Sequence, residues 1–103
     1  MAIRLEQGYE YKGKEYWEWW VWVDGPEQDL DQIEYVEYTL HPTFPRPVRR
    51  ITDRSSKFRL KTAGWGVFTI YAKVGHKNKR QTMLEHFLQL SYPDDTPAPG
   101  KDT

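Results

Sequence analysis

The sequence contains no cysteine, no excess of either charge and no long apolar run, and each absence excludes a class of protein. Without cysteine, disulfides and thiolate metal sites are excluded, which fits a reducing compartment. The 15 basic residues equal the 15 acidic ones, whereas a dedicated nucleic-acid-binding domain usually has a basic excess. No apolar run approaches the roughly 18 residues of a membrane helix, and the charged first six residues lack a signal-peptide core. We therefore expect a cytoplasmic protein without a nucleic-acid or membrane partner.

Catalytic and metal-binding motifs are also missing. The three histidines, His41, His76 and His86, do not have the spacing of metal ligands, and no nucleophile elbow or phosphate-binding loop occurs. His76 lies in a polar turn, where a histidine is usually solvated. His86 shares a strand face with leucines, which favours a core or strand-edge role, and the acidic pair Asp94-Asp95 lies in a polar tail. We expect no catalytic residue, no metal ion and no cofactor.

Aromatic residues are abundant and make up 16% of the 103 residues. This content excludes intrinsic disorder for the body of the chain, and the length suits one domain. Short runs rich in β-branched and aromatic residues recur about every ten residues between turn signals, which predicts an all-β sandwich or barrel of about seven or eight antiparallel strands. The predicted strands are residues 3–11, 16–24, 33–40, 48–51, 57–62, 68–74 and 80–90, with one helical turn at 27–32.

The most aromatic of these segments is residues 16–24, which read Tyr-Trp-Glu-Trp-Trp-Val-Trp-Val-Asp. Such density predicts a central strand that is buried on both faces. A carbohydrate-binding sandwich, the other use of many tryptophans, would need coplanar aromatic side chains exposed along one strand. Because both faces of this strand look core-like, we rank that alternative low.

The last segment of the chain has a different composition from the rest. Residues 93–103 are rich in proline and polar side chains and contain no large apolar residue. Such a composition predicts a linker or disordered tail after a domain formed by residues 1–92. A linker in this place suggests that the domain is one module of a longer protein.

Two predicted loops each carry an aromatic residue. Residues 41–47, His-Pro-Thr-Phe-Pro-Arg-Pro, contain three prolines and cannot form a regular ladder. Residues 64–66, Gly-Trp-Gly, break the next strand pattern with two glycines. An aromatic residue on a loop either packs inward or meets a ligand. The residues alone favour the first alternative, in which Phe44 and Trp65 close the end of the sandwich.

The order and spacing of four segments resemble a YEATS domain. They are Gly-Pro-Glu at residues 25–27, the strand 36–40, the loop 41–47 and Gly-Trp-Gly-Val-Phe at residues 64–68. The resemblance extends over residues 17–90, and its most specific part is the loop 41–47. The tryptophan in place of the commoner tyrosine, together with the tryptophan-rich second strand, is similar to the prokaryotic branch of the family.

The resemblance implies an immunoglobulin-like β-sandwich that binds acetyl-, crotonyl- or other acyl-lysine at one end. The residues that match the two binding loops of the family are His41, Thr43 and Phe44 in the first, and Gly64, Trp65 and Gly66 in the second, with Phe68 behind them. The family often supplies a further aromatic residue before the second strand, a place that Tyr16 or Trp17 would fill.

The chemistry of these residue types suits an acylated lysine, which is uncharged and carries a planar amide. We expect Phe44 and Trp65 to face each other across a slot about 7 Å wide, roughly two stacking contacts. The Thr43 hydroxyl would accept from the amide N–H, with His41 bracing it, and the backbone N–H of Trp65 would donate to the acyl oxygen. Glycines beside Trp65 would leave the slot open-ended, so longer acyl groups would fit.

These observations predict a non-enzymatic, monomeric reader that binds an acylated-lysine peptide or protein. The main alternative is a prokaryotic sensor or interaction module of the same shape. That module would recognise a different ligand or partner protein, and would be attached to an effector or signalling domain in the same longer chain.

Overall fold

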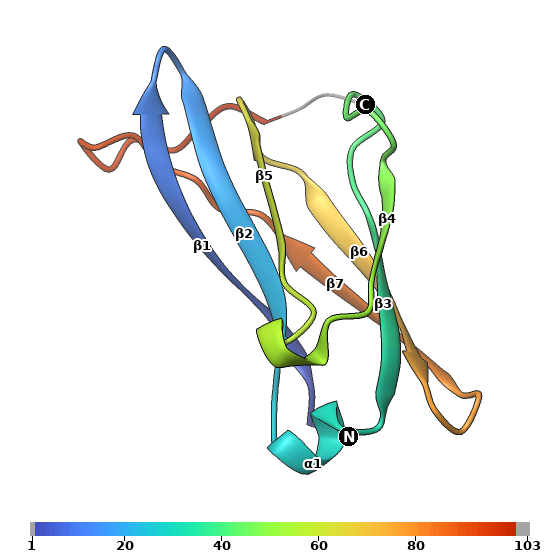
Figure 1. The fold of residues 1–103 in the computed structure, drawn as a ribbon. Coiled ribbons are helices and arrows are strands. Elements are labelled where there is room, and N and C mark those ends of the chain that lie inside the picture. The colour runs from blue at the N-terminus through green and yellow to red at the C-terminus, as the bar shows by residue number, and fades with distance from the viewer. Residues whose placement is uncertain (1, 101–103) are drawn as a thin grey trace.

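Two antiparallel sheets face each other in the computed structural model, which describes residues 2–100 (Figure 1). The first sheet has the order β1-β2-β5, with bounds Arg4–Gly13, Tyr16–Asp24 and Leu60–Gly64. The second has the order β4-β3-β6-β7, with bounds Val48–Ile51, Ile33–Thr39, Thr69–His76 and Gln81–Phe87. A helical turn α1, Glu27–Leu30, follows β2, and a 3₁₀ turn η1, Arg54–Ser56, precedes β5. The immunoglobulin-like β-sandwich predicted from the sequence is confirmed.

The residues of β2 alternate between the core and the outer surface, so the first sheet is buried on one face only. Trp17, Trp19, Val21 and Val23 alternate along the strand and are fully buried, whereas the intervening Tyr16, Glu18, Trp20 and Trp22 remain partly or largely exposed. The prediction that β2 is buried on both faces is therefore wrong. Its even-numbered residues form the outer face of the sandwich, because a sheet covered by a second sheet on one side only leaves alternate side chains outside.

The second sheet supplies the other half of the core in the same way. Ile70, Ala72 and Val74 of β6 are fully buried, and Tyr38 of β3 joins them from the neighbouring strand. The Tyr38 hydroxyl donates to the carbonyl oxygen of Phe58 at 2.6 Å, and burial raises the pKa of Tyr38. This bond ties the second sheet to the segment that leads from η1 into β5.

A side-chain bridge joins the edge strands β1 and β7. The Gln7 amide donates to the Gln89 carbonyl at 2.7 Å, and its oxygen accepts from the Gln89 backbone N–H at 2.8 Å. The same oxygen lies 2.7 Å from Nε2 of His86, so this nitrogen carries a proton. Burial lowers the pKa of His86, which favours its neutral form in the folded chain.

His76 is placed differently from the sequence-based prediction. It was expected in a solvated turn, but it ends β6 and is only 5% exposed. Its Nε2 lies 2.8 Å from the Thr82 hydroxyl, and its backbone N–H donates to the Arg80 carbonyl. The strand continues to His76 because the β6–β7 hairpin pairs beyond Gly75, so the turn begins two residues later than the composition indicates.

Residues 93–100 of the predicted tail pack against the sandwich. Ala98 is buried, and its backbone N–H donates to the Leu90 carbonyl at 3.0 Å. The backbone N–H of Val67 donates to the Pro99 carbonyl, also at 3.0 Å. Residues 101–103 lie outside the described part, and the interpretation of residues 93–103 as a linker or disordered tail stays a prediction. A domain boundary at residue 92 stays a prediction.

Candidate functional site

Two loops meet at one end of the sandwich and form the candidate site. The first, residues 40–47, connects β3 to β4, and the second, residues 65–68, connects β5 to β6. The first loop is closed at its base, where the Leu40 backbone N–H donates to the Pro47 carbonyl at 2.7 Å. A turn inside it is fixed by a bond from the Phe44 N–H to the His41 carbonyl at 3.0 Å. The proline-rich sequence thus forms an ordered loop.

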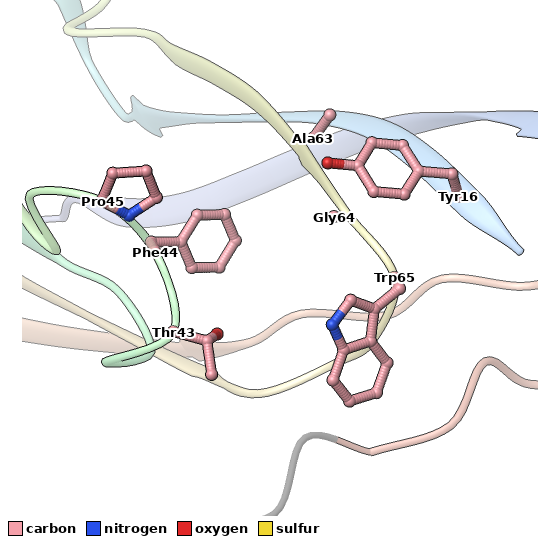
Figure 2. Close-up of a pocket in the computed structure, with 7 residues that line it drawn as sticks. All are labelled: Tyr16, Thr43, Phe44, Pro45, Ala63, Gly64 and Trp65. Carbon is pink, nitrogen blue, oxygen red and sulfur yellow. The ribbon is translucent and has the colours of Figure 1, made fainter.

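A pocket of about 140 Å³ lies between these loops and the start of β2 (Figure 2). Figure 2 shows Thr43 and Phe44 on one side of the opening, and Tyr16 and Trp65 on the other. All of its lining side chains are uncharged, namely those of Tyr16, Thr43, Phe44, Pro45, Ala63, Gly64 and Trp65. The pocket is therefore suited to a small uncharged group with apolar surface.

The two aromatic residues of the loops have different environments. Phe44 is only 8% exposed and packs on Phe68 and Trp19, with ring centroids 5.4 and 6.2 Å apart. Trp65 is 44% exposed. Phe44 is therefore a fixed wall that belongs to the core, whereas Trp65 is a wall that borders solvent.

A histidine orients the hydroxyl at the edge of the pocket. Nδ1 of His41 accepts from the Thr43 backbone N–H at 3.2 Å, and it lies 3.0 Å from the Thr43 hydroxyl oxygen. A nitrogen that accepts the backbone N–H carries no proton, so the hydroxyl donates to it as well. His41 is held in place by burial, at 7% exposure, and by its ring contact with Phe68.

Gly64 permits the close packing behind the pocket. A β-carbon at this position would lie 3.3 Å from Cζ of Phe44 and 3.9 Å from Nε1 of Trp19. The first separation is shorter than an ordinary van der Waals contact, so a side chain here would press Phe44 toward the opening. The absence of a side chain at Gly64 thus sets the position of the Phe44 ring.

The structure brings four of the seven predicted site residues together around the pocket: Thr43, Phe44, Gly64 and Trp65. His41 and Phe68 lie behind them and line a second, more apolar cavity of about 470 Å³ beside β6, while Gly66 is buried in the loop. The assignment of these seven residues to ligand binding stays a prediction.

Three lining residues were not among the predicted site residues. Tyr16 had been one of two alternatives for a further aromatic residue; it lines the pocket, whereas Trp17 is fully buried in the core. Pro45 and Ala63 were not anticipated. The register that pairs Trp17 with Gly64 brings Tyr16 and Ala63 to the site, and this register depends on contacts between distant segments. Pro45 had a local signal, since it directly follows Phe44.

No helix within residues 2–100 is long and apolar enough to cross a bilayer. Within the same residues, no three His, Asp or Glu side chains come together as a group that could hold a metal ion.

Comparison with known proteins identifies the family. Residues 17–89 match the model of the prokaryotic YEATS domain, which covers well over half of the chain. The chain belongs to the YEATS domain family. The protein AF-9 homolog of Saccharomyces cerevisiae is 36% identical over 89 residues, which span 82% of this chain and 38% of that protein. Subunit 14 of transcription initiation factor TFIID from Schizosaccharomyces pombe is 38% identical, over 69% of this chain and 30% of that protein.

Solved YEATS domains have the same fold. The Yaf9 YEATS domain bound to H3K27ac superposes with a TM-score of 0.72 at 27% identity, covering 93% of this chain and 78% of that one. The Yaf9 YEATS domain recognizing an H3K122suc peptide gives 0.65 at 28% identity, covering 92% and 72%. The family is one of binding modules rather than enzymes. The chain spans less than two fifths of the curated relatives described above.

Proposed function

We propose that this YEATS domain is a reader that binds an acylated lysine in the pocket between Phe44 and Trp65. The observation that carries the proposal is the complete absence of charged side chains among the seven lining residues, which include three with aromatic rings. Acylation converts the lysine ammonium into a neutral amide, which such a pocket accepts without a desolvated charge. An unmodified lysine would bring its charge to a pocket without a carboxylate. The Yaf9 YEATS domains bound to H3K27ac and to an H3K122suc peptide agree with this ligand class.

The polar groups of the pocket provide partners for the amide. The Thr43 oxygen, whose proton is donated to His41, accepts from the amide N–H of the acyl-lysine. The backbone N–H of Trp65 donates to the acyl oxygen. Both partners are needed, because a buried amide that loses one hydrogen bond costs about 1–3 kcal/mol.

The aromatic walls favour flat acyl groups. Phe44 provides a fixed surface, and Trp65 closes over the acyl plane from the solvent side. A crotonyl group has two more carbons than acetyl and a conjugated plane. If about half of this added surface is buried, it contributes about 1 kcal/mol, or roughly fivefold tighter binding.

Binding of short peptides tests the proposal. Isothermal titration calorimetry with one peptide carrying unmodified, acetyl- or crotonyl-lysine should give binding only to the acylated forms, with crotonyl the tighter. Trp65→Ala should abolish measurable binding, whereas Tyr9→Ala, which removes a similarly exposed aromatic residue from β1, should not. Equal affinity for unmodified lysine would refute the proposal. Absence of binding to every acyl form would favour the module that recognises a different ligand.

Further expectations concern the chain segments beside the domain, its oligomeric state, its location and its source. Because the curated relatives extend well beyond the matched region, we propose that this domain works beside other chain segments, such as an effector or signalling domain. Its monomeric state, its cytoplasmic location and a prokaryotic source stay predictions. The acylated partner is identified here only by its modified lysine.

A further inference from the structure

The outer face of the first sheet carries a second candidate site, away from the acyl-lysine pocket. Trp20 and Trp22 point outward from β2, because the residues between and beside them fill the core. A cavity of about 360 Å³ lies beside them, within the roughly 300–1,000 Å³ that small-molecule sites occupy. Its lining residues are Trp20, Trp22, Ser55, Ser56, Lys57 and Arg59.

Trp20 lies flat on the neighbouring strand. It pairs with Gly8 of β1, and a β-carbon at Gly8 would lie only 2.4 Å from Nε1 of Trp20. Two cations lie over the indole, with the Arg59 guanidinium 5.3 Å and the Lys61 ammonium 5.6 Å from the ring centroid. Cation–π contacts of this kind hold Arg59 above the sheet beside the cavity.

The wall of the cavity opposite the tryptophans is anchored in the core. It is formed by the end of η1, where Lys57 and Phe58 both have left-handed backbone conformations with φ of 59°. Phe58 is fully buried, and its carbonyl oxygen accepts from the Tyr38 hydroxyl. Non-glycine residues hold this conformation only where surrounding contacts enforce it, so the wall is fixed before a ligand arrives.

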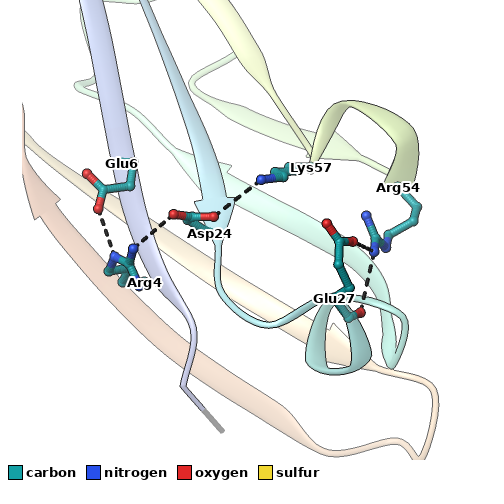
Figure 3. Close-up of polar contacts among 6 residues, drawn as sticks. All are labelled: Arg4, Glu6, Asp24, Glu27, Arg54 and Lys57. Carbon is teal, nitrogen blue, oxygen red and sulfur yellow. Dashed lines mark hydrogen bonds and ion pairs between the residues drawn. The ribbon is translucent and has the colours of Figure 1, made fainter.

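Three of the four cations around the cavity form ion pairs with carboxylates. Lys57 pairs with Asp24 at 3.4 Å, and Asp24 also pairs with Arg4 at 2.9 Å (Figure 3). The Gly25 backbone N–H, and then Lys57 and Arg4, lower the pKa of Asp24, so this carboxylate is ionised and engaged. Lys61 pairs with Glu18 at 3.3 Å.

Arg59 is the fourth cation. Within residues 2–100, no carboxylate pairs with its guanidinium, whose described contact is with the Trp20 ring, and its backbone N–H donates to the Ser56 hydroxyl at 3.2 Å. Glu6, the remaining carboxylate beside Trp22, is paired with Arg4 at 2.8 Å. Asp53, whose carboxylate accepts from the Ser55 hydroxyl, is a fourth carboxylate beside these four cations, but within residues 2–100 no carboxylate forms an ion pair with Arg59.

We propose that this cavity binds a nucleoside phosphate. The base stacks on the indole of Trp22, which has no ring or cation contact in the described part of the chain. The phosphate pairs with Arg59. The sugar lies beside Ser55 and Ser56, whose hydroxyls donate to the carboxylate and the backbone carbonyl of Asp53. A neutral sugar would use the aromatic surface but not the unpaired cation, and an inorganic anion would use the cation but not the indole.

Indole signals in a two-dimensional ¹H–¹⁵N NMR spectrum provide the test, because the five tryptophans give separate N–H peaks that single Trp→Phe variants assign. Titration with adenosine monophosphate should shift the Trp20 and Trp22 peaks saturably at sub-millimolar to millimolar concentration, and leave the Trp65 peak in place. Arg59→Gln should weaken binding about five- to tenfold, as expected for a lost charged hydrogen bond. Arg80→Gln, which removes an exposed arginine from the β6–β7 hairpin, should have no effect.

Four results would overturn the proposal: no saturable shift at 10 mM nucleotide, unchanged affinity in Arg59→Gln, equal affinity for adenosine, or equal affinity for methyl glucoside. Circular dichroism of each variant verifies the fold. The test uses no acyl-lysine ligand, so its outcome is independent of the proposed reader function.

Discussion

The Thr43 hydroxyl gives the sharpest test of how the acyl-lysine pocket works. Thr43→Val preserves the shape of the side chain but removes the oxygen that lies 3.0 Å from Nδ1 of His41. The backbone N–H of Thr43 still donates to that nitrogen, so the loop keeps one of its two bonds to the histidine. The variant therefore changes the hydrogen-bonding capacity of the pocket more than its structure.

The expected loss follows from the fate of the ligand amide. In Thr43→Val the amide N–H of a bound acyl-lysine faces a methyl group, which leaves a desolvated donor without an acceptor. Such a donor costs about 1–3 kcal/mol, and because the pocket is open to solvent on the Trp65 side we expect about 1–2 kcal/mol. Affinity for an acetyl-lysine peptide should therefore fall roughly 5- to 30-fold.

Calorimetry with two controls separates this effect from a change in stability. Thr43→Ser retains the hydroxyl and should bind within about threefold of the original chain. Thr82→Val removes the hydroxyl from the comparable pair with His76, where the two atoms are 2.8 Å apart at a distance from the site. It should lower stability but leave affinity unchanged. Affinity of Thr43→Val within twofold of the original, or equal weakening by Thr82→Val, would refute the reasoning.

Three other predictions concern packing, a buried hydrogen bond and pH. Gly64→Ala should weaken acyl-lysine binding several-fold in calorimetry, because its β-carbon would press Phe44 into the pocket; unchanged affinity would contradict this. Tyr38→Phe should lower the free energy of unfolding in urea by about 1–3 kcal/mol, since the Phe58 carbonyl loses its 2.6 Å bond, and a loss under 0.5 kcal/mol would argue against it. The lowered pKa of His86 means that the unfolded chain binds its proton first, so the melting temperature should fall as pH drops below about 6.5. His86→Gln should reduce this dependence, and an identical pH profile in the variant would exclude His86 as its source.

The sequence predicted the architecture well because alternation along a strand is a local signal. The buried residues of β6 recur at every second position, as a half-buried strand requires. The same logic failed for the outer face of β2. Trp20 and Trp22 are large and apolar, so the composition indicates a second buried face. Trp20 instead lies flat on Gly8 and beneath cations, an arrangement that depends on the pairing of β1 with β2.

Polar composition was a poor guide where backbone hydrogen bonds determine the structure. His76 stands among glycine and polar residues, yet its backbone pairing across the hairpin holds it inside. Residues 93–100 contain no large apolar side chain, but backbone bonds at Ala98 and Pro99 dock them on the sandwich. Backbone hydrogen bonds form regardless of the side chain that a residue carries, so amino-acid composition does not predict them.

The side chains of the acyl-lysine pocket also have environments that the sequence alone did not predict. From the residues alone, an aromatic residue on a loop either packs into the core or faces a ligand. The composition favoured inward packing for both Phe44 and Trp65. Phe44 has Trp19 and Phe68 beneath it and is almost fully buried, whereas Trp65 stays largely exposed. The difference arises because Trp19 of β2 and Phe68 of the loop before β6 are distant in the sequence and meet only in the folded chain. The core therefore fixes one wall of the pocket, and Trp65 is the wall that a ligand would have to order.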